Sequence, residues 1–274
     1  MTRGLIILNQ DRRFNHTYTF LQSKLSIEPV KTLEEFINSI QHEDWKFIIL
    51  PVRGVNDTGY IDGTDIVIHD AILPKFTGKV IYTGLISSLL EKLAEQYGFR
   101  IVSYLTNDFA IKNNYITVEG IIETIVNHSD KAIYGSKIAI LGYGKLGVIC
   151  AKVLKNMKAQ VTVVARNDKD RLHASIYDFA VLDYSEFAKR ITEYDFIINT
   201  VPNKVIANDT LASLIGTETT IIDVSSPPFG LDHEFAKTNQ IKAFLLPGIP
   251  GKIAPKTSGL ILGETIYKQI IGGE

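Results

Sequence analysis

Glycines at a regular spacing near the middle of the chain are the residues whose type and spacing predict chemistry most directly. Residues 138–141 form a short apolar run, and Gly142, Gly144 and Gly147 follow it in G-x-G-x-x-G spacing. This pattern predicts a buried parallel strand, a tight turn and a helix whose N-terminal N–H groups bind a pyrophosphate. We therefore expect a dinucleotide to contact Gly142, Tyr143, Gly144, Lys145, Leu146 and Gly147.

The residues after the next predicted strand, 160–165, indicate which dinucleotide binds. An enzyme that uses NAD usually has Asp or Glu there, which accepts a hydrogen bond from the ribose 2′-hydroxyl. This chain has Arg166 and Asn167 instead. Because a guanidinium forms charge-assisted hydrogen bonds with phosphate, the 2′-phosphate of NADP would be favoured. NADP is the predicted cofactor, with Arg166 and Asn167 in its site.

Two later strands also end in residues that could face this cofactor. The predicted strand 196–198 leads into Thr200, Val201 and Pro202, and the predicted strand 220–224 ends near Asp223 and Ser225. Ligands of open parallel sheets bind outside the carboxyl ends of the strands. We therefore expect these five residues to contact the cofactor.

The N-terminal part of the chain offers charged residues for a substrate. Asp11 and Arg13 follow a predicted strand at 5–8, and Arg53 follows another at 47–50. Taken singly, each is better explained by a solvated loop charge. Residues 53–79 predict an irregular excursion, and a long loop of this kind can cover a substrate site.

Proline, glycine and lysine are concentrated in residues 247–257. This composition predicts a rigid cationic loop in which Lys252 and Lys256 could hold a carboxylate. The apolar spacing of residues 258–270 predicts a final helix that packs back onto the first domain.

The alternation of apolar runs and helical patterns predicts an α/β fold with two domains. A chain of 274 residues is long enough for both. We expect an N-terminal α/β domain on the substrate side (1–106), a linking helix (107–130), a Rossmann-type NADP-binding domain (131–250), and a return loop with a C-terminal helix (251–274).

The overall composition limits the classes of partner. Hydrophobic residues make up 45% of the chain and charged residues 22%, with a formal net charge of -1, so we expect a soluble protein that binds neither nucleic acid nor a membrane. The first apolar run is too short for a signal peptide, and cytoplasm is the expected location. The six histidines show no metal-ligand spacing, so we expect no metal. Cys150, as the single cysteine, excludes an internal disulfide and is expected to be buried.

Four stretches together resemble the A subunits of dipicolinate synthase from endospore-forming bacteria: 117–120, 142–147 with 165–166, 199–202, and 247–257. The resemblance extends over nearly the whole chain and is weaker before residue 107, where Asn9 and Gln10 replace a Gly-Gly pair of the family. It implies that NADP oxidises a cyclic dihydro- or hydroxytetrahydrodicarboxylate to dipicolinate during sporulation. It also implies a flavoprotein-like partner, the B subunit of dipicolinate synthase. We further expect a homo-oligomer.

The implied reaction needs residues in two roles. Arg53, Lys252 or Lys256 would hold the carboxylates of the substrate. Ser225 and Thr257 would be neutral hydrogen-bond donors to it. Aromatisation also needs removal of a proton, which the nicotinamide does not supply. Glu119 and Lys256 are the predicted catalytic residues, with Glu119 as the candidate proton acceptor and His233 or water as alternatives.

Two other functions remain open. The glycine loop late in a two-domain chain also fits a 2-hydroxyacid-dehydrogenase-like oxidoreductase. That enzyme would need an Arg where Asp223 and Ser225 stand, which ranks it second. The chain could also be a non-catalytic NADP-binding subunit of a complex, because the residues form no complete acid–base constellation.

Overall fold

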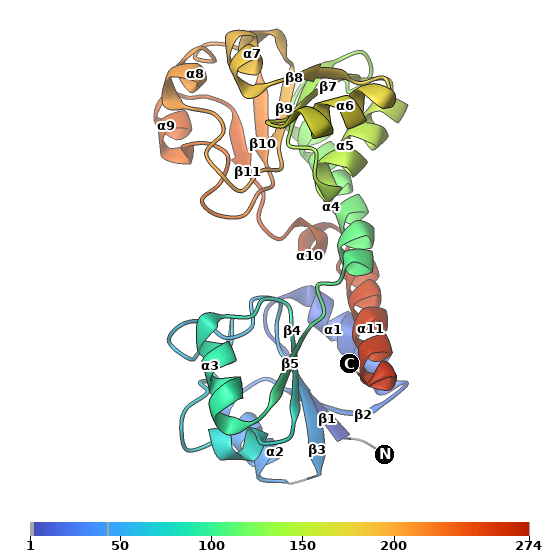
Figure 1. Cartoon of the computed structure of the whole chain (residues 1–274), viewed down its shortest axis with the longest axis vertical. Coiled ribbons are helices and arrows are strands. Elements are labelled where there is room, and N and C mark those ends of the chain that lie inside the picture. The colour runs from blue at the N-terminus through green and yellow to red at the C-terminus, as the bar shows by residue number, and fades with distance from the viewer. Residues whose placement is uncertain (1–2, 43, 274) are drawn as a thin grey trace. The chain divides into compact units, whose positions relative to one another are not determined.

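The computed structural model describes residues 3–42 and 44–273, which divide into two compact units (Figure 1). The first unit contains Met1–Asn113 and Ala254–Glu274, and the second contains Asn114–Ile253. Each holds a parallel β-sheet between helices, which confirms the predicted α/β class. Helix α4 (Asn107–His128) matches the predicted linking helix closely and spans the division. The predicted domain limits at 106, 130 and 250 stay a prediction.

The sheet of the first unit follows the order β2-β1-β3-β4-β5. Helices cover both of its faces, so the inner strands β1, β3 and β4 carry consecutive buried apolar residues and not an alternating pattern, whereas the edge strands β2 and β5 also carry polar residues. Leu5 and Ile7 pack on the side of α2 and α3, whereas Ile6 packs on the side of α1 and α11. The strands are β1 (Arg3–Ile7), β2 (Ser26–Val30), β3 (Trp45–Ile49), β4 (Val80–Thr83) and β5 (Arg100–Ser103), and the helices are α1 (Arg12–Gln22), α2 (Leu33–Gln41), α3 (Ser88–Tyr97) and α11 (Pro255–Gly272).

The C-terminal helix α11 packs on α1 within the first unit, as the sequence predicted. A Cβ atom at Gly259 would lie 2.5 Å from the backbone oxygen of Arg13, so the two helices approach to backbone contact. The hydroxyl of Thr17 donates to the carbonyl oxygen of Gly259 at 2.9 Å. The first turns of α1 and α11 therefore lie side by side.

The excursion 53–79 is irregular, as expected, but it is packed and not an open flap. Its apolar side chains Ile61, Ile66 and Phe76 are fully buried in the core beneath α2 and α3. Isolated antiparallel bridges and a 3-10 helix, η1 (Leu73–Phe76), satisfy part of its backbone. Asn9 ties the excursion to the end of β1 by donating to the carbonyl of Asp62 at 3.1 Å.

The sheet of the second unit follows the order β11-β10-β9-β6-β7-β8, and its pairs are parallel. This is the doubly wound Rossmann order. The chain adds strands outward from β6 to β8, then returns to the other side of β6 and adds strands outward from β9 to β11. The strands are β6 (Lys137–Leu141), β7 (Gln160–Val164), β8 (Ala180–Leu182), β9 (Phe196–Asn199), β10 (Thr220–Asp223) and β11 (Ala243–Leu245). The helices are α5 (Lys145–Asn156), α6 (Asp168–Ile176), α7 (Tyr184–Lys189), α8 (Asn208–Ala212), α9 (His233–Thr238) and α10 (Ile249–Ile253), with a 3-10 helix, η2 (Ile191–Glu193).

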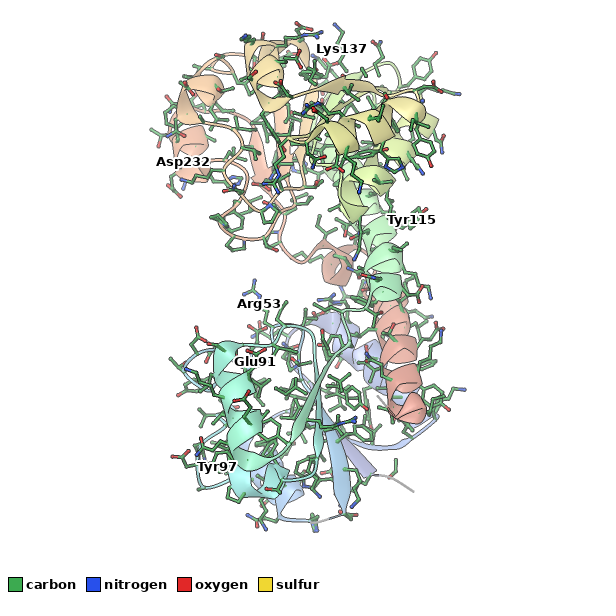
Figure 2. All side chains as sticks on the ribbon, in the orientation of Figure 1. Arg53, Glu91, Tyr97, Tyr115, Lys137 and Asp232 are labelled. Carbon is green, nitrogen blue, oxygen red and sulfur yellow. The ribbon has the colours of Figure 1, made fainter. Side chains whose placement is uncertain are left out.

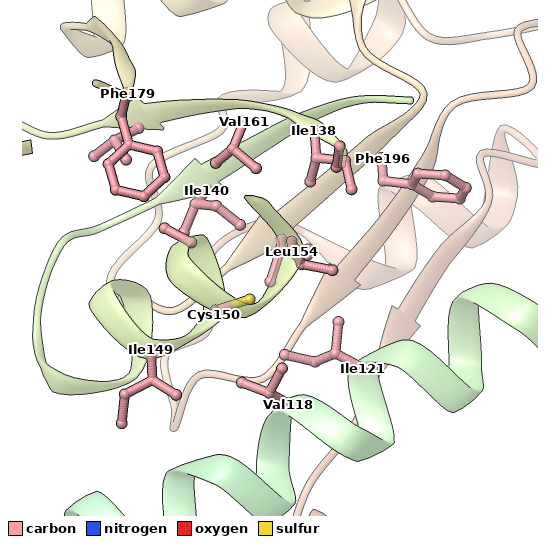
Figure 3. Packing of buried hydrophobic residues seen from close by; sticks show 14 of the residues in the cluster. Val118, Ile121, Ile138, Ile140, Ile149, Cys150, Leu154, Val161, Phe179 and Phe196 are labelled. Atoms are coloured by element: carbon pink, nitrogen blue, oxygen red, sulfur yellow. The ribbon is translucent and has the colours of Figure 1, made fainter. Parts of the chain in front are cut away.

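Alternate residues of β6 enter separate cores on the two faces of this sheet. Ile138 and Ile140 pack with α4, α5 and α6, and Figure 3 shows this core with Val118 and Ile121 of α4 facing the sheet. Ala139 and Leu141 pack instead with α7, α8 and α9. Cys150 is buried in the first of these cores, as predicted, and burial raises the pKa of its thiol to about 12.

The structure corrects the interpretation of residues 247–257 as a loop. Ile249–Ile253 form helix α10, and α11 already begins at Pro255. Proline is compatible with the first turn of a helix because the N–H group that it lacks has no intrahelical partner there. Pro250 and Pro255 therefore lie in the first turns of α10 and α11. Helices α6 and α8 were not expected from the sequence, because their residues carry little helical periodicity.

Candidate dinucleotide site

A cavity of about 480 Å³ opens at the carboxyl ends of β6, β7 and β9. It lies at the point where the strand order of the second unit reverses, which is where open α/β sheets bind ligands. Most of the residues predicted for the cofactor line it together: Gly142, Tyr143, Gly144, Lys145, Leu146, Arg166, Asn167, Thr200, Val201 and Pro202. Ala165, Asp170, Tyr184, Asn203 and Val205 complete the lining.

The three glycines of the loop meet different physical requirements. Gly142 has φ +94, and a Cβ there would come within 2.7 Å of the Thr200 hydroxyl. Gly147 is buried against the carbonyl of Gly142. Gly144 is the N-cap of α5, and a Cβ there would meet no protein atom within 4 Å. The space beside Gly144 thus leaves room for a ligand to approach the first turn of the helix.

Charged side chains gather where β7 leads into α6. Arg171 donates to the carbonyl of Ala165 at 2.6 Å and forms an ion pair with Asp168. The carboxylate of Asp170 accepts a hydrogen bond from Asn167 at 2.9 Å. Arg166 is exposed and has no ion pair or hydrogen bond within residues 3–42 and 44–273. Its guanidinium is therefore available to a ligand.

Two tyrosines modify the polarity of this cavity. Burial raises the pKa of Tyr184 to about 12, although the nearby charge of Arg166 acts in the opposite direction. Tyr143 is 6% exposed, and its hydroxyl is buried without a hydrogen-bond partner in the described part of the chain. Burial likewise raises the pKa of Tyr143. Both phenols are thus neutral groups at physiological pH.

Asp223 and Ser225 do not line the cavity. Asp223 is fully buried, and its carboxylate accepts hydrogen bonds from Asn199, from Ser225 and from the backbone N–H of Gly230. His233 Nε2 lies 3.1 Å from the same carboxylate. Burial raises the pKa of Asp223, but these hydrogen bonds outweigh burial and the net pKa lies below the ordinary value. Contact of Asp223 and Ser225 with the cofactor stays a prediction.

Five of the seven residues predicted for the substrate belong to the first unit, and two belong to the second: Asp11, Arg13, Arg53, Lys256 and Thr257 in the first, and Ser225 and Lys252 in the second. The strand order of the first unit reverses between β1 and β3, and Asp11 and Arg53 follow these two strands. Asp11 is the N-cap of α1 and forms an ion pair with Arg13, so these two charges partly satisfy one another. Arg53 is exposed, and Figure 2 shows its side chain directed away from the ribbon. Lys256 is exposed in the first turn of α11, beside α1.

Comparison with known proteins identifies the family. Residues 113–241 match the family model described as S-adenosyl-L-homocysteine hydrolase, NAD binding domain. The A subunit of dipicolinate synthase from Bacillus subtilis (strain 168) is 32% identical over 238 residues, which are 85% of this chain and 80% of that protein. The chain belongs to the family of dipicolinate synthase A subunits. The resemblance stated from the sequence is therefore confirmed, and the chain is a nicotinamide-dinucleotide-dependent oxidoreductase, as predicted.

Solved structures of dipicolinate synthase A subunits share the whole fold. The Bacillus subtilis structure is 28% identical, with a TM-score of 0.86, and the match covers 99% of this chain and 96% of that chain. The structure from Bacillus halodurans is 26% identical, with a TM-score of 0.85, and covers 98% and 97% respectively.

Two of the stretches that carry the family resemblance contact each other in the second unit. A Cβ atom at Gly120 of α4 would lie 2.3 Å from the Cγ2 atom of Ile249 in α10. A cavity of about 300 Å³ adjoins this contact, and both Lys252 and Glu123 line it. Glu119, the predicted proton acceptor, is exposed on α4 but lines neither this cavity nor the dinucleotide cavity.

Several residues that line these two cavities were not predicted from the sequence. Asp170 and Tyr184 line the dinucleotide cavity from α6 and α7, and Glu123 reaches the second cavity one turn after Glu119. For Asp170 the sequence did offer a signal. Its separation from the glycine loop along the chain is similar to that of the Asp or Glu that binds the ribose 2′-hydroxyl in NAD enzymes. In the described residues, no group of three or more His, Cys, Asp or Glu side chains could hold a metal ion. None of the helices there has the length and apolar character needed to cross a membrane.

Proposed function

We propose that this chain is the NADP-dependent component of a dipicolinate synthase and oxidises a cyclic dihydro- or hydroxytetrahydrodipicolinate intermediate to dipicolinate during sporulation. The observation that carries the cofactor assignment is the unpartnered Arg166 in the cavity of about 480 Å³. Family membership supports the reaction and a partner, the B subunit of dipicolinate synthase. A homo-oligomer is part of the same proposal.

The residues of the second unit fit a dinucleotide. The open space beside Gly144 admits a pyrophosphate to the start of α5, where free N–H groups favour negative charge. Arg166 is exposed and unpartnered, whereas the neighbouring Arg171 is held by Asp168 and the Ala165 carbonyl. Because an Arg guanidinium can form bidentate hydrogen bonds with a phosphate group, Arg166 is the proposed ligand of the 2′-phosphate.

The oxidation requires the dihydro ring to lose one hydride and one proton, and a hydroxytetrahydro ring must lose water as well. When bound, the nicotinamide accepts the hydride. The chain must provide the proton acceptor, for which Glu119 remains the candidate. His233 is the alternative, because its Nε2 atom lies 3.1 Å from Asp223, which would stabilise a protonated ring.

The substrate brings two carboxylates, which need cations. Arg53 and Lys256 of the first unit are both exposed, and neither has an ion pair within residues 3–42 and 44–273. Lys252 offers a third exposed cation, and Thr257 an uncharged hydroxyl. We propose that Arg53, Lys252 or Lys256 holds the substrate carboxylates, with Lys256 also acting at the reacting ring. Asp11 and Arg13 support these residues from the start of α1.

The test is an oxidation assay with the purified chain, the cyclic dicarboxylate freshly prepared, and NADP. We expect the absorbance of reduced nicotinamide to rise. If the chain alone is inactive, the assay is repeated with the B subunit added, and the rise is expected then. The matched control is Gly144→Ala, which should abolish the rise while the protein stays folded. NADP binding without any rise, even with the B subunit, would instead support a non-catalytic NADP-binding role.

A further inference from the structure

The start of helix α6 carries a reciprocal contact between two residues of the dinucleotide cavity. Asn167 is the N-cap of this helix, and its Oδ1 atom accepts a hydrogen bond from the backbone N–H of Asp170 at 2.8 Å. Its Nδ2 atom donates to the Asp170 carboxylate at 2.9 Å. Both residues line the cavity together with Arg166. A carboxylate is therefore held close to the residue proposed for the 2′-phosphate.

We propose that the Asn167–Asp170 pair determines cofactor specificity, an inference that rests on the proposed NADP function. A carboxylate beyond the second strand of a Rossmann sheet is the group that accepts a hydrogen bond from the 2′-hydroxyl of NAD. Asp170 is a carboxylate in this region, and the amide of Asn167 donates to its Oδ2 atom. The amide thereby competes with the ribose for this oxygen and fixes the orientation of the carboxylate, while Arg166 has no ion pair or hydrogen bond in the described part of the chain and can meet the 2′-phosphate.

Helix capping does not explain the choice of Asn at position 167. An N-cap needs an oxygen acceptor, and Ser, Asp and Asn serve about equally well. The amide adds a donor, and this donor is the group that contacts the Asp170 carboxylate. The neighbouring cation Arg171 cannot take over that role, because it is engaged with Asp168 and with the carbonyl of Ala165.

The decisive variant is Asn167→Ser, which keeps the cap oxygen and removes the amide donor. In the full-length chain, calorimetric titration with NAD and NADP should show NAD binding about threefold more tightly and NADP about threefold more weakly than in wild type. Asp170→Asn, which removes the carboxylate, should strengthen NADP binding without strengthening that of NAD. In the double variant Asn167→Ser/Asp170→Asn, the gain in NAD affinity should disappear.

Two results would overturn this inference. One is an unchanged ratio of NADP to NAD affinity in Asn167→Ser, with a melting temperature equal to that of wild type. The other is the same gain in NAD affinity when Asp170 is already Asn, because the effect would then not act through the carboxylate. Failure of the proposed function is a separate result: the wild-type chain would show no preference for NADP, whatever the variants do.

Discussion

Gly147 of helix α5 lies against the carbonyl oxygen of Gly142, so closely that a Cβ atom at position 147 would be 2.2 Å from that oxygen. This contact holds the first turn of α5 on the end of β6. Gly144 lies between the two in the chain, yet a Cβ there would meet nothing within 4 Å. One glycine is thus required by packing within the protein, and the other leaves space for a ligand.

Alanine at these two positions should therefore have different effects. Gly147→Ala should lower the free energy of unfolding by about 1–3 kcal/mol, because backbone atoms must move. Gly144→Ala should lower it by less than about 1 kcal/mol, the difference between Gly and Ala at an N-cap. Both should weaken dinucleotide binding. Urea unfolding and cofactor titration measure the two effects, and normal cofactor affinity in Gly144→Ala would contradict the site.

Arg166→Ala should weaken NADP binding by about 1.5–3 kcal/mol, the value of a hydrogen bond to a charged group. NAD binding should change little, because NAD lacks the 2′-phosphate. Lys169→Ala is the matched control, since Lys169 is an exposed cation of α6 that does not line the cavity. Equilibrium titration with both cofactors tests the prediction. An equal loss for NAD and NADP would refute the role of Arg166.

Lys256→Ala should lower kcat/KM for the dicarboxylate, by an amount that corresponds to a loss of about 1.5–3 kcal/mol of transition-state stabilisation. Cofactor affinity should stay unchanged. The physical reason is the loss of a cation that pairs with a substrate carboxylate. Lys268→Ala removes another exposed lysine of α11 and should have no effect on either quantity. Steady-state kinetics at saturating NADP provides the measurement. An unchanged substrate response in Lys256→Ala would move the carboxylate to other cations.

Tyr143→Phe should stabilise the protein by about 1 kcal/mol, because it removes a buried hydroxyl that has no partner in the described part of the chain. Thr219→Val is the opposite control in the same unit. It removes a buried hydroxyl that donates to the carbonyl of Tyr194 at 2.8 Å, and should cost about 1 kcal/mol. Thermal unfolding of both variants beside wild type gives the comparison. Destabilisation by Tyr143→Phe would show that the hydroxyl has a partner in solution.

Acid should destabilise the protein through Asp223. Its folded-state pKa lies below the ordinary value, so its contribution to stability is complete above the unfolded-state pKa of about 3.9. That contribution is lost as the pH falls through the lower folded-state pKa. Asp223→Asn should lower stability at neutral pH and flatten its decline in acid. Asp178→Asn, an exposed control, should keep the wild-type profile in unfolding experiments across this range.

Local spacing predicted much of this protein, because some requirements of a fold act over a few residues. The G-x-G-x-x-G spacing predicted strand, turn and helix from 138 onward, and the apolar spacing predicted a helix at 107–130, which corresponds to α4 at Asn107–His128. The presence of Arg166 and Asn167 in place of a carboxylate directly after β7 was also visible in the sequence. The role of Asp11 as the N-cap of α1 was not predicted, because the sequence was interpreted to place Asp11 among the charges of the substrate side.

The sequence by itself determined the α/β class, the family and the dinucleotide loop. Tertiary structure alone decided which side chains meet. The contact of Gly120 with Ile249, the burial of Asp223 and the shared cavity of Arg166, Asp170 and Tyr184 depend on residues far apart in the chain or on the turn of a helix. Periodicity fixes the face on which a side chain lies, but packing between elements sets its neighbours, and neighbours determine which charges remain free for a ligand.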